Sequence, residues 1–190
     1  MALSPLALCS AALVKIGALP LASLGDGSAE ATVASQLYPL VRDSLLAAHP
    51  WTFALRQVRP ERLAQAPEAD FRHAFALPAD FLAALSVGTG TRGRNVTYRV
   101  AAGAVHTDAE AIVLTYVSRP EEAAFPPLFD HVLVAALAAE FCVPLTENTS
   151  RADVLGRQAK EALRDAKRID SQQDTPGAIE DFTLIRARRG

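Results

Sequence analysis

The sequence contains few of the residues that usually carry chemistry or covalent crosslinks. Its 190 residues include two cysteines, four histidines and one tryptophan, and aromatic residues make up only 6% of the chain. Two cysteines are too few for a disulfide framework. Cys9 and Cys142 both fall in apolar, helical patterns, so we expect buried, reduced thiols. A hydrophobic content of 50% supplied mainly by alanine and leucine is typical of a helical core.

An excess of charge of one sign is also lacking. The chain has 19 basic and 21 acidic residues, for a net charge of −2, which excludes a strong overall field for nucleic acids or acidic membranes. The first 24 residues are apolar enough to resemble a signal peptide, but no positive segment precedes them and Lys15 interrupts them. No stretch approaches a transmembrane helix free of polar residues. We therefore expect a cytosolic protein with no membrane partner.

Motifs for catalysis or cofactor binding are missing. The sequence has no GxSxG, Walker loop, GxGxxG or HExxH. His131 and Cys142 share nearly one face of a predicted helix. They are about 16 Å apart along its axis, which is too far for a base and its nucleophile. His106 and Asp108 could both ligate a metal from one strand face, although no third ligand is evident. The sequence therefore predicts no catalytic, cofactor-binding or metal site and no enzyme activity.

The main feature that is present is a long amphipathic helix over residues 28–50. Asp26 and Ser28 are candidate N-caps, and Pro50 ends the pattern because proline disfavours a helical residue before it. Pro39 should kink this helix without breaking it, since the apolar pattern continues beyond it. The residues predicted to share its buried face recur at spacings of three and four: Val33, Leu37, Leu40, Val41, Leu45 and Ala48.

The chain's only tryptophan follows this helix directly. Because the helix is expected to stop one residue before Trp51, we predict that Trp51 and Phe53 lie at the junction between a helical bundle and a β unit. Tryptophan next to the end of an apolar helix is most often simply a core residue.

Residues 51–119 are predicted to form a small antiparallel β unit inserted between helices, because no full helix separates its strands. Six short segments have the composition of strands: 53–59, 72–78, 82–88, 95–100, 103–108 and 111–118. Residues 101–103 indicate a tight hairpin, and LPADF could add one helical turn. The loop at 88–95 contains Arg92 and Arg94, which could contact phosphates or a tail protein, or simply face solvent.

Further helical patterns lie at both ends of the chain. Ser4 and Pro5 begin the first helix and Gly17 ends it. A helix that is apolar nearly all round starts after Pro126 and is expected to end at Pro144; this pattern predicts a central position. The last helix, over 149–171, has one apolar face: Leu155, Ala159, Ala162, Leu163, Ala166 and Ile169.

These patterns predict an α+β fold. An antiparallel bundle of about four helices, from residues 1–50 and 120–172, would carry the inserted β unit of residues 51–119 and an extended C-terminal tail of residues 173–190. No exposed apolar stripe is evident beyond what the bundle needs. We therefore expect a monomer in dilute solution.

The C-terminal tail is separated from the last helix by Pro176-Gly177, so it cannot continue that helix. It carries an apolar cluster and then a basic end: Ile179, Phe182, Leu184, Ile185, Arg186, Arg188 and Arg189. Two interpretations are open for it. The apolar residues could fold back onto their own bundle, or they could dock on a partner protein.

The order of these signals resembles the tail tubular protein A family of tailed phages, the head–tail adaptor or gatekeeper (connector) proteins. The resemblance spans nearly the whole chain and depends on ALVKIGALPLASLGDGSAEA, LLAAHPWTFA, LPADFLAAL, YRVAAGAVHTD and AIVLTYVSRP in this order. The first of these and the WTF that follows the second helix are the most distinctive. The alanine-rich closing helices are generic, so the virion could be short-tailed or long-tailed.

The resemblance implies a virion protein that forms a dodecameric ring beneath the portal protein. Such a ring would join the portal to a tail or nozzle protein and line the conduit through which genomic DNA leaves, without reading its sequence. The C-terminal tail would grip the portal. Two other classes stay open from sequence: a murein-degrading tail accessory enzyme and a small DNA-binding regulator.

Overall fold

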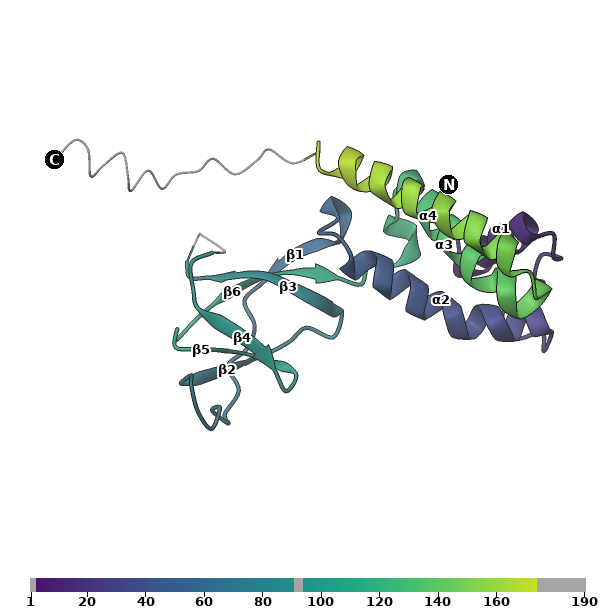
Figure 1. The fold of residues 1–190 in the computed structure, drawn as a ribbon. Helices are drawn as coiled ribbons and strands as arrows, with labels where there is room; N and C mark the ends of the chain where they lie inside the picture. Colours follow the sequence, from purple (N-terminus) through teal and green to yellow (C-terminus); the bar gives the residue numbers. More distant parts are fainter. Residues whose placement is uncertain (1–2, 91–93, 174–190) are drawn as a thin grey trace, which may run out of the picture.

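The computed structural model describes residues 3–90 and 94–173. Within them the fold is mixed α+β, as predicted, with four helices and two small antiparallel sheets. The helices gather at one end of the molecule and the sheets at the other (Figure 1). The helices are α1 (Pro5–Ile16), α2 (Ala29–Ala47), α3 (Pro127–Thr146) and α4 (Thr149–Asp170), and two short 3-10 turns are η1 (Thr52–Ala54) and η2 (Glu122–Ala124).

The first two helices begin and end where their sequences indicate. The hydroxyl groups of Ser4 and Ser28 accept hydrogen bonds from the first turns of α1 and α2, as N-caps do. Gly17 ends α1 with a φ of 81°, a conformation that glycine adopts without strain. The α2 helix continues through Pro39 and ends at Ala47, just before His49-Pro50.

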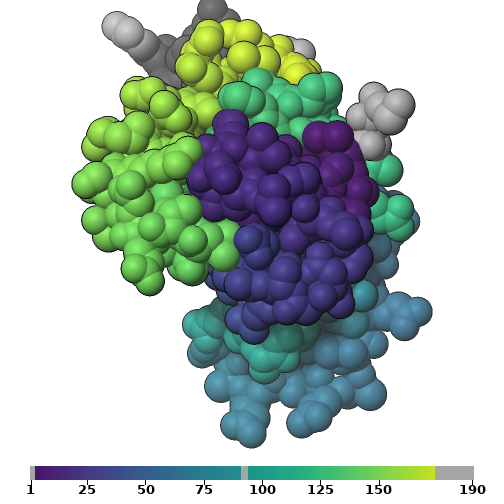
Figure 2. All heavy atoms as spheres, turned by 90° about the vertical axis from the view of Figure 1, so that its right-hand side faces the viewer, coloured from purple at the N-terminus to yellow at the C-terminus, as the bar shows by residue number. Residues whose placement is uncertain are grey.

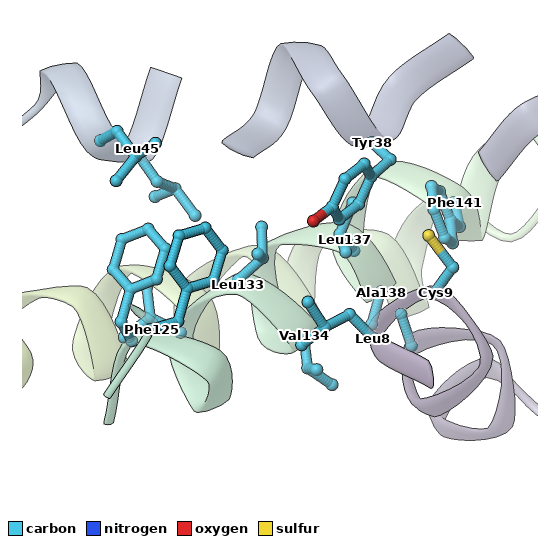
Figure 3. Close-up of a cluster of buried hydrophobic side chains, with 14 of the residues drawn as sticks. Leu8, Cys9, Tyr38, Leu45, Phe125, Leu133, Val134, Leu137, Ala138 and Phe141 are labelled. Carbon is cyan, nitrogen blue, oxygen red and sulfur yellow. The ribbon is translucent and has the colours of Figure 1, made fainter. Parts of the chain in front are cut away.

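The apolar helix α3 is central, as predicted, and packs against α1, α2 and α4. In Figure 3, Leu137 and Phe141 of α3 lie among side chains of α1 and α2, including Leu8 and Tyr38. Among the described residues, α3 is also long and apolar enough to cross a membrane by length and composition. Its packing against three helices is that of a core helix.

The predicted end of α3 is wrong, because the helix continues through Pro144 to Thr146. Pro144 lacks the N–H that would have bonded to the carbonyl of Glu140, so the helix continues with one backbone hydrogen bond missing at this point. The helix stops only when Glu147 adopts a φ of 53°.

The buried face of α2 also differs from the prediction. Ala31, Ala34 and Tyr38 are buried, whereas Leu40 is 66% exposed. Of the predicted face, Leu45 is buried and Val33, Leu37 and Val41 are half-buried against the core, so only Leu40 and Ala48 are exposed. In α4 the predicted face is likewise only partly buried: Ala166 is fully buried, but Ile169 is 38% exposed.

The six predicted strands all form, in two three-stranded antiparallel sheets. In the first, β6 (Val113–Ser118) lies between β1 (Leu55–Val58) and β3 (Phe81–Gly88). In the second, β5 (Ala104–Thr107) lies between β2 (His73–Ala76) and β4 (Tyr98–Ala101). A second hydrophobic core, separate from that of the helices, contains Phe75, Val87, Val105, Ile112, Leu114 and Tyr116.

Two turns explain how these strands are connected. The β4–β5 hairpin turns at Ala102 and Gly103, whose φ angles are 49° and 72°, as in the turns that suit two-residue hairpins. LPADF does not form the helical turn considered from sequence. It is a simple turn in which the N–H of Phe81 donates to the carbonyl of Pro78, and it leads directly into β3.

A view towards the helical end shows α1 lying beside the start of α4, with residues of the β strands visible below the helices (Figure 2). Arg151 of α4 joins the two helices, since its Nη2 donates to the carbonyl of Lys15 at 3.0 Å. The chain's beginning and its last helix are thus attached to each other as well as to α3.

Candidate functional site

Trp51 is buried at the point where α2 gives way to β1, with 2% of its surface exposed. Its Nε1 donates to the carbonyl of Leu45 at 2.8 Å, which satisfies the indole inside the core. Its ring meets Phe129 of α3 edge-on at a centroid distance of 5.2 Å, and the ring of Phe53 lies 6.1 Å away. The residues predicted to form the junction therefore pack together, on both α2 and α3.

The same connection is held by Asp170, the last residue of α4. Its carboxylate is 5% exposed and accepts from Thr52 Oγ1 at 2.8 Å and from the Thr52 N–H at 3.2 Å. His49 Nε2 lies 3.2 Å from the same carboxylate. Nearby, Lys167 Nζ donates to the carbonyl of Ala48 at 2.8 Å. The last turn of α4 is thus attached to the segment that leads from α2 into β1.

A charged network lies on the other side of α2, facing the chain between β6 and η2. Asp43 accepts from Arg119 Nη2 at 2.7 Å and from Arg42 Nε at 2.9 Å. Glu122 accepts from Arg42 Nη1 at 3.1 Å and from the Tyr38 hydroxyl at 2.8 Å. These contacts connect α2 to the end of β6 and so complement the packing around Trp51.

Burial and hydrogen bonding act in opposite directions on the pKa values in this network. Burial alone would raise the pKa of Asp43, but the hydrogen bonds from Arg119 and Arg42 outweigh it, and the pKa lies below its usual range. Burial would also raise the pKa of Glu122, but hydrogen bonds from its own backbone N–H, the Tyr38 hydroxyl and Arg42 outweigh it and lower this pKa. Burial and the carboxylate of Glu122 raise the pKa of Tyr38. Asp43 and Glu122 are therefore stabilising as carboxylates and act as structural charges.

An apolar groove lies between α2 and α4, with α3 at its floor; we call it the α2–α4 groove. Its volume is about 420 Å³. Leu40 is exposed in this groove, a feature that the sequence pattern does not indicate. It is lined by Leu37, Leu40, Val41, Ser44 and Leu45 of α2, Ala136, Ala139 and Glu140 of α3, and Gly156, Ala159, Lys160 and Leu163 of α4.

A second, more polar hollow of about 350 Å³ lies beside β2. It is lined by Arg62, Arg72 and His73 together with Leu63, Ala64 and Ala66 of the preceding loop. The Nδ1 atom of His73 is buried and has no hydrogen-bond partner. The three residues are spread over a loop and a strand start, which is why no sequence motif indicates this hollow.

The other residues singled out from sequence are not brought together. Arg94 is exposed in the segment before β4, while Arg92 and the residues of the C-terminal tail from 174 onward lie outside the described residues. Asp108 accepts from the backbone N–H of Arg72, and among residues 3–90 and 94–173 no three metal-ligating side chains cluster. Burial raises the pKa of the Cys9 thiol to about 12, so this thiol is not a nucleophile at neutral pH.

Comparison with known proteins assigns no family. No family model matches the chain, and a comparison with curated proteins finds no match.

Proposed function

We propose that this protein is a structural head–tail adaptor of a tailed bacteriophage or phage-like particle. It would sit in the neck of the virion, in a dodecameric ring between the portal protein and a tail or nozzle protein. The ring would line the conduit for genomic DNA and would require no cofactor. Before assembly the protein would be in the host cytoplasm.

The observation that supports this proposal most is the structural role of the residues that carry the family resemblance. Gly17 ends α1, Ser28 begins α2, and Trp51 attaches α2 to β1 and α3. These residues make helix caps and packing contacts. Residues of this kind hold helices and sheets in one relative position, as a protein requires when its two ends contact different partners.

The charge of the chain suits a conduit for DNA. Its net charge is −2, so the protein has little overall attraction for a passing duplex, and each phosphate held by lysine or arginine would retard ejection. We propose that the loop with Arg92 and Arg94 faces the lumen or the tail protein. Contacts of these arginines with the phosphates of the DNA would be independent of its sequence.

The C-terminal tail is proposed to bind the portal. Ile179, Phe182, Leu184 and Ile185 would supply apolar anchors, and Arg186, Arg188 and Arg189 would add charge at the rim of the contact. Each fully buried apolar side chain contributes about 1.5–3 kcal/mol, and a ring repeats this contact in every copy.

Electron microscopy of the protein mixed with purified portal tests this proposal directly. We expect extra ring-shaped density on one face of the portal, with the rotational symmetry of the portal's adaptor-binding face. The protein alone and the portal alone are the controls. Clearing of peptidoglycan by the purified protein, or tight, salt-sensitive duplex binding by a monomer, would instead support the enzyme or the regulator.

A further inference from the structure

The α2–α4 groove is left open by the described residues although its walls are apolar. Leu40 on the α2 wall is 66% exposed, and alanines of α3 form much of the floor. The groove's charged members are Glu140 on α3 and Lys160 on α4. An apolar groove with a charge of each sign at its border is suited to an amphipathic peptide segment.

Gly156 gives a second indication that another segment enters the groove. It lies within α4, where glycine is less favourable than alanine. A Cβ at this position would have no atom within 4 Å, so packing among the described residues gives no reason for a glycine. A bare backbone in the groove wall does permit close approach by a segment from outside.

The C-terminal tail begins at one end of this groove. There α4 meets the end of α2, through Lys167 with Ala48 and Asp170 with His49. Leu163, in the groove wall, lies about 15 Å back along the helix from Gln173, at 1.5 Å per residue. Six further residues of chain reach up to about 20 Å. Ile179 can therefore reach Leu163 of its own molecule, and later residues can reach farther along the groove.

The chemistry of the tail matches the groove. Ile179, Phe182 and Ile185 are spaced by three, so one or two helical turns would place them on one side. Acidic Glu180 and Asp181 precede the basic Arg186 in this segment. When the segment runs back along α4, the two acidic residues can face Lys160, and Arg186 can face Glu140.

We propose that, in the unassembled protein, residues 178–186 occupy the α2–α4 groove of their own chain and leave it when the protein joins its ring. This contact hides two apolar surfaces at once, the groove and the tail. It therefore allows a monomer in solution despite the exposed Leu40. The release step rests on the proposed function, whereas the docked state concerns the free protein alone.

A nitroxide spin label on a Lys160→Cys variant tests the docked state without any portal. Both native thiols are buried, so the label goes to the new cysteine. In NMR spectra of the full-length chain we expect the amide signals of residues 178–186 to lose most of their intensity. A second sample mixes isotope-labelled chains that carry no spin label with spin-labelled chains that carry no isotope, so it reports only contacts between molecules. In this mixed sample we expect the tail signals to keep their intensity.

Matched substitutions complete the test. Leu40→Asp, added to the spin-labelled Lys160→Cys protein, puts a charge on the groove wall. Because this position is exposed, the fold should persist, while the NMR signals of the tail should regain their intensity. Leu19→Asp, at a residue 79% exposed and outside the groove, should change nothing. Undiminished amide signals of residues 178–186 in the spin-labelled Lys160→Cys protein would show that the groove is empty. Loss in the mixed sample would show that a second copy's tail fills it. Either result would overturn the proposal without affecting the adaptor assignment.

Discussion

Trp51 both packs in the hydrophobic core and donates a hydrogen bond inside it. Its ring contributes to the core shared by the helices, and its N–H uses a carbonyl of α2 that the helix end leaves without an internal partner. The neighbouring Thr52 then binds Asp170 of α4. Two adjacent residues thus attach the α2–β1 connection to both α3 and α4.

Replacing Trp51 with alanine should lower the free energy of unfolding by about 3–5 kcal/mol, because it removes a large buried side chain and leaves a cavity. Trp51→Phe should cost less, since only the hydrogen bond to Leu45 and part of the ring are lost. Equilibrium urea unfolding measures both, and Leu19→Ala, at an exposed position, is the control. A loss below about 1 kcal/mol for Trp51→Ala would show that the tryptophan does not hold this junction.

The Asp43 network should make stability depend on acid pH. The folded-state pKa of Asp43 is lowered, so its contribution is complete above the ordinary value of about 3.9 and is lost as pH falls through the lower, folded value. Asp43→Asn should cost about 1–3 kcal/mol at pH 7 and flatten the acid limb of the stability profile. Urea unfolding between about pH 7 and pH 2 measures this, with Asp153→Asn as an exposed control. An unchanged acid limb in Asp43→Asn would contradict the assignment.

At the scale of elements, most of the fold could be predicted because local signals determine it. Serine caps, Gly17 and the strand segments depend on neighbours in the sequence, and all are found where expected. The exposure of Leu40 could not be predicted, since alanine and leucine are both apolar and only packing between helices decides which of them is buried. The division of six strands between two sheets depends on non-local pairing for the same reason.

The β4–β5 hairpin offers a test at this scale. Ala102 holds a φ of 49°, which costs an alanine roughly 1–2 kcal/mol relative to its preferred conformations. Ala102→Asn creates the Asn-Gly pair that favours this turn and should stabilise the protein by about 0.5–1 kcal/mol. Urea unfolding checks it, and Ala101→Asn, within β4, should not stabilise. Destabilisation by Ala102→Asn would mean that the turn is held by contacts other than its backbone.

At the scale of the whole molecule, the candidate sites were the least predictable feature. The junction around Trp51 could be located because an isolated tryptophan follows a helix end. Asp170 and the groove around Leu40 could not, because each depends on elements far apart in sequence that meet only in the folded chain.

A chain truncated after Asp174 tests the separate roles of the α2–α4 groove and the C-terminal tail. Every residue of the two described hydrophobic cores precedes the cut, so the truncated protein should fold and unfold cooperatively, with a melting temperature only a few degrees lower. It should fail to bind portal in co-sedimentation, because the proposed anchors Ile179, Phe182, Leu184 and Ile185 are gone. Its open groove should also favour self-association, which light scattering would detect. A full-length Leu40→Asp protein is the matched control: its tail is released but present, so it should bind portal. Normal portal binding by the truncated chain would end the tail-docking proposal, and unfolding of that chain would mean that the tail belongs to its own core.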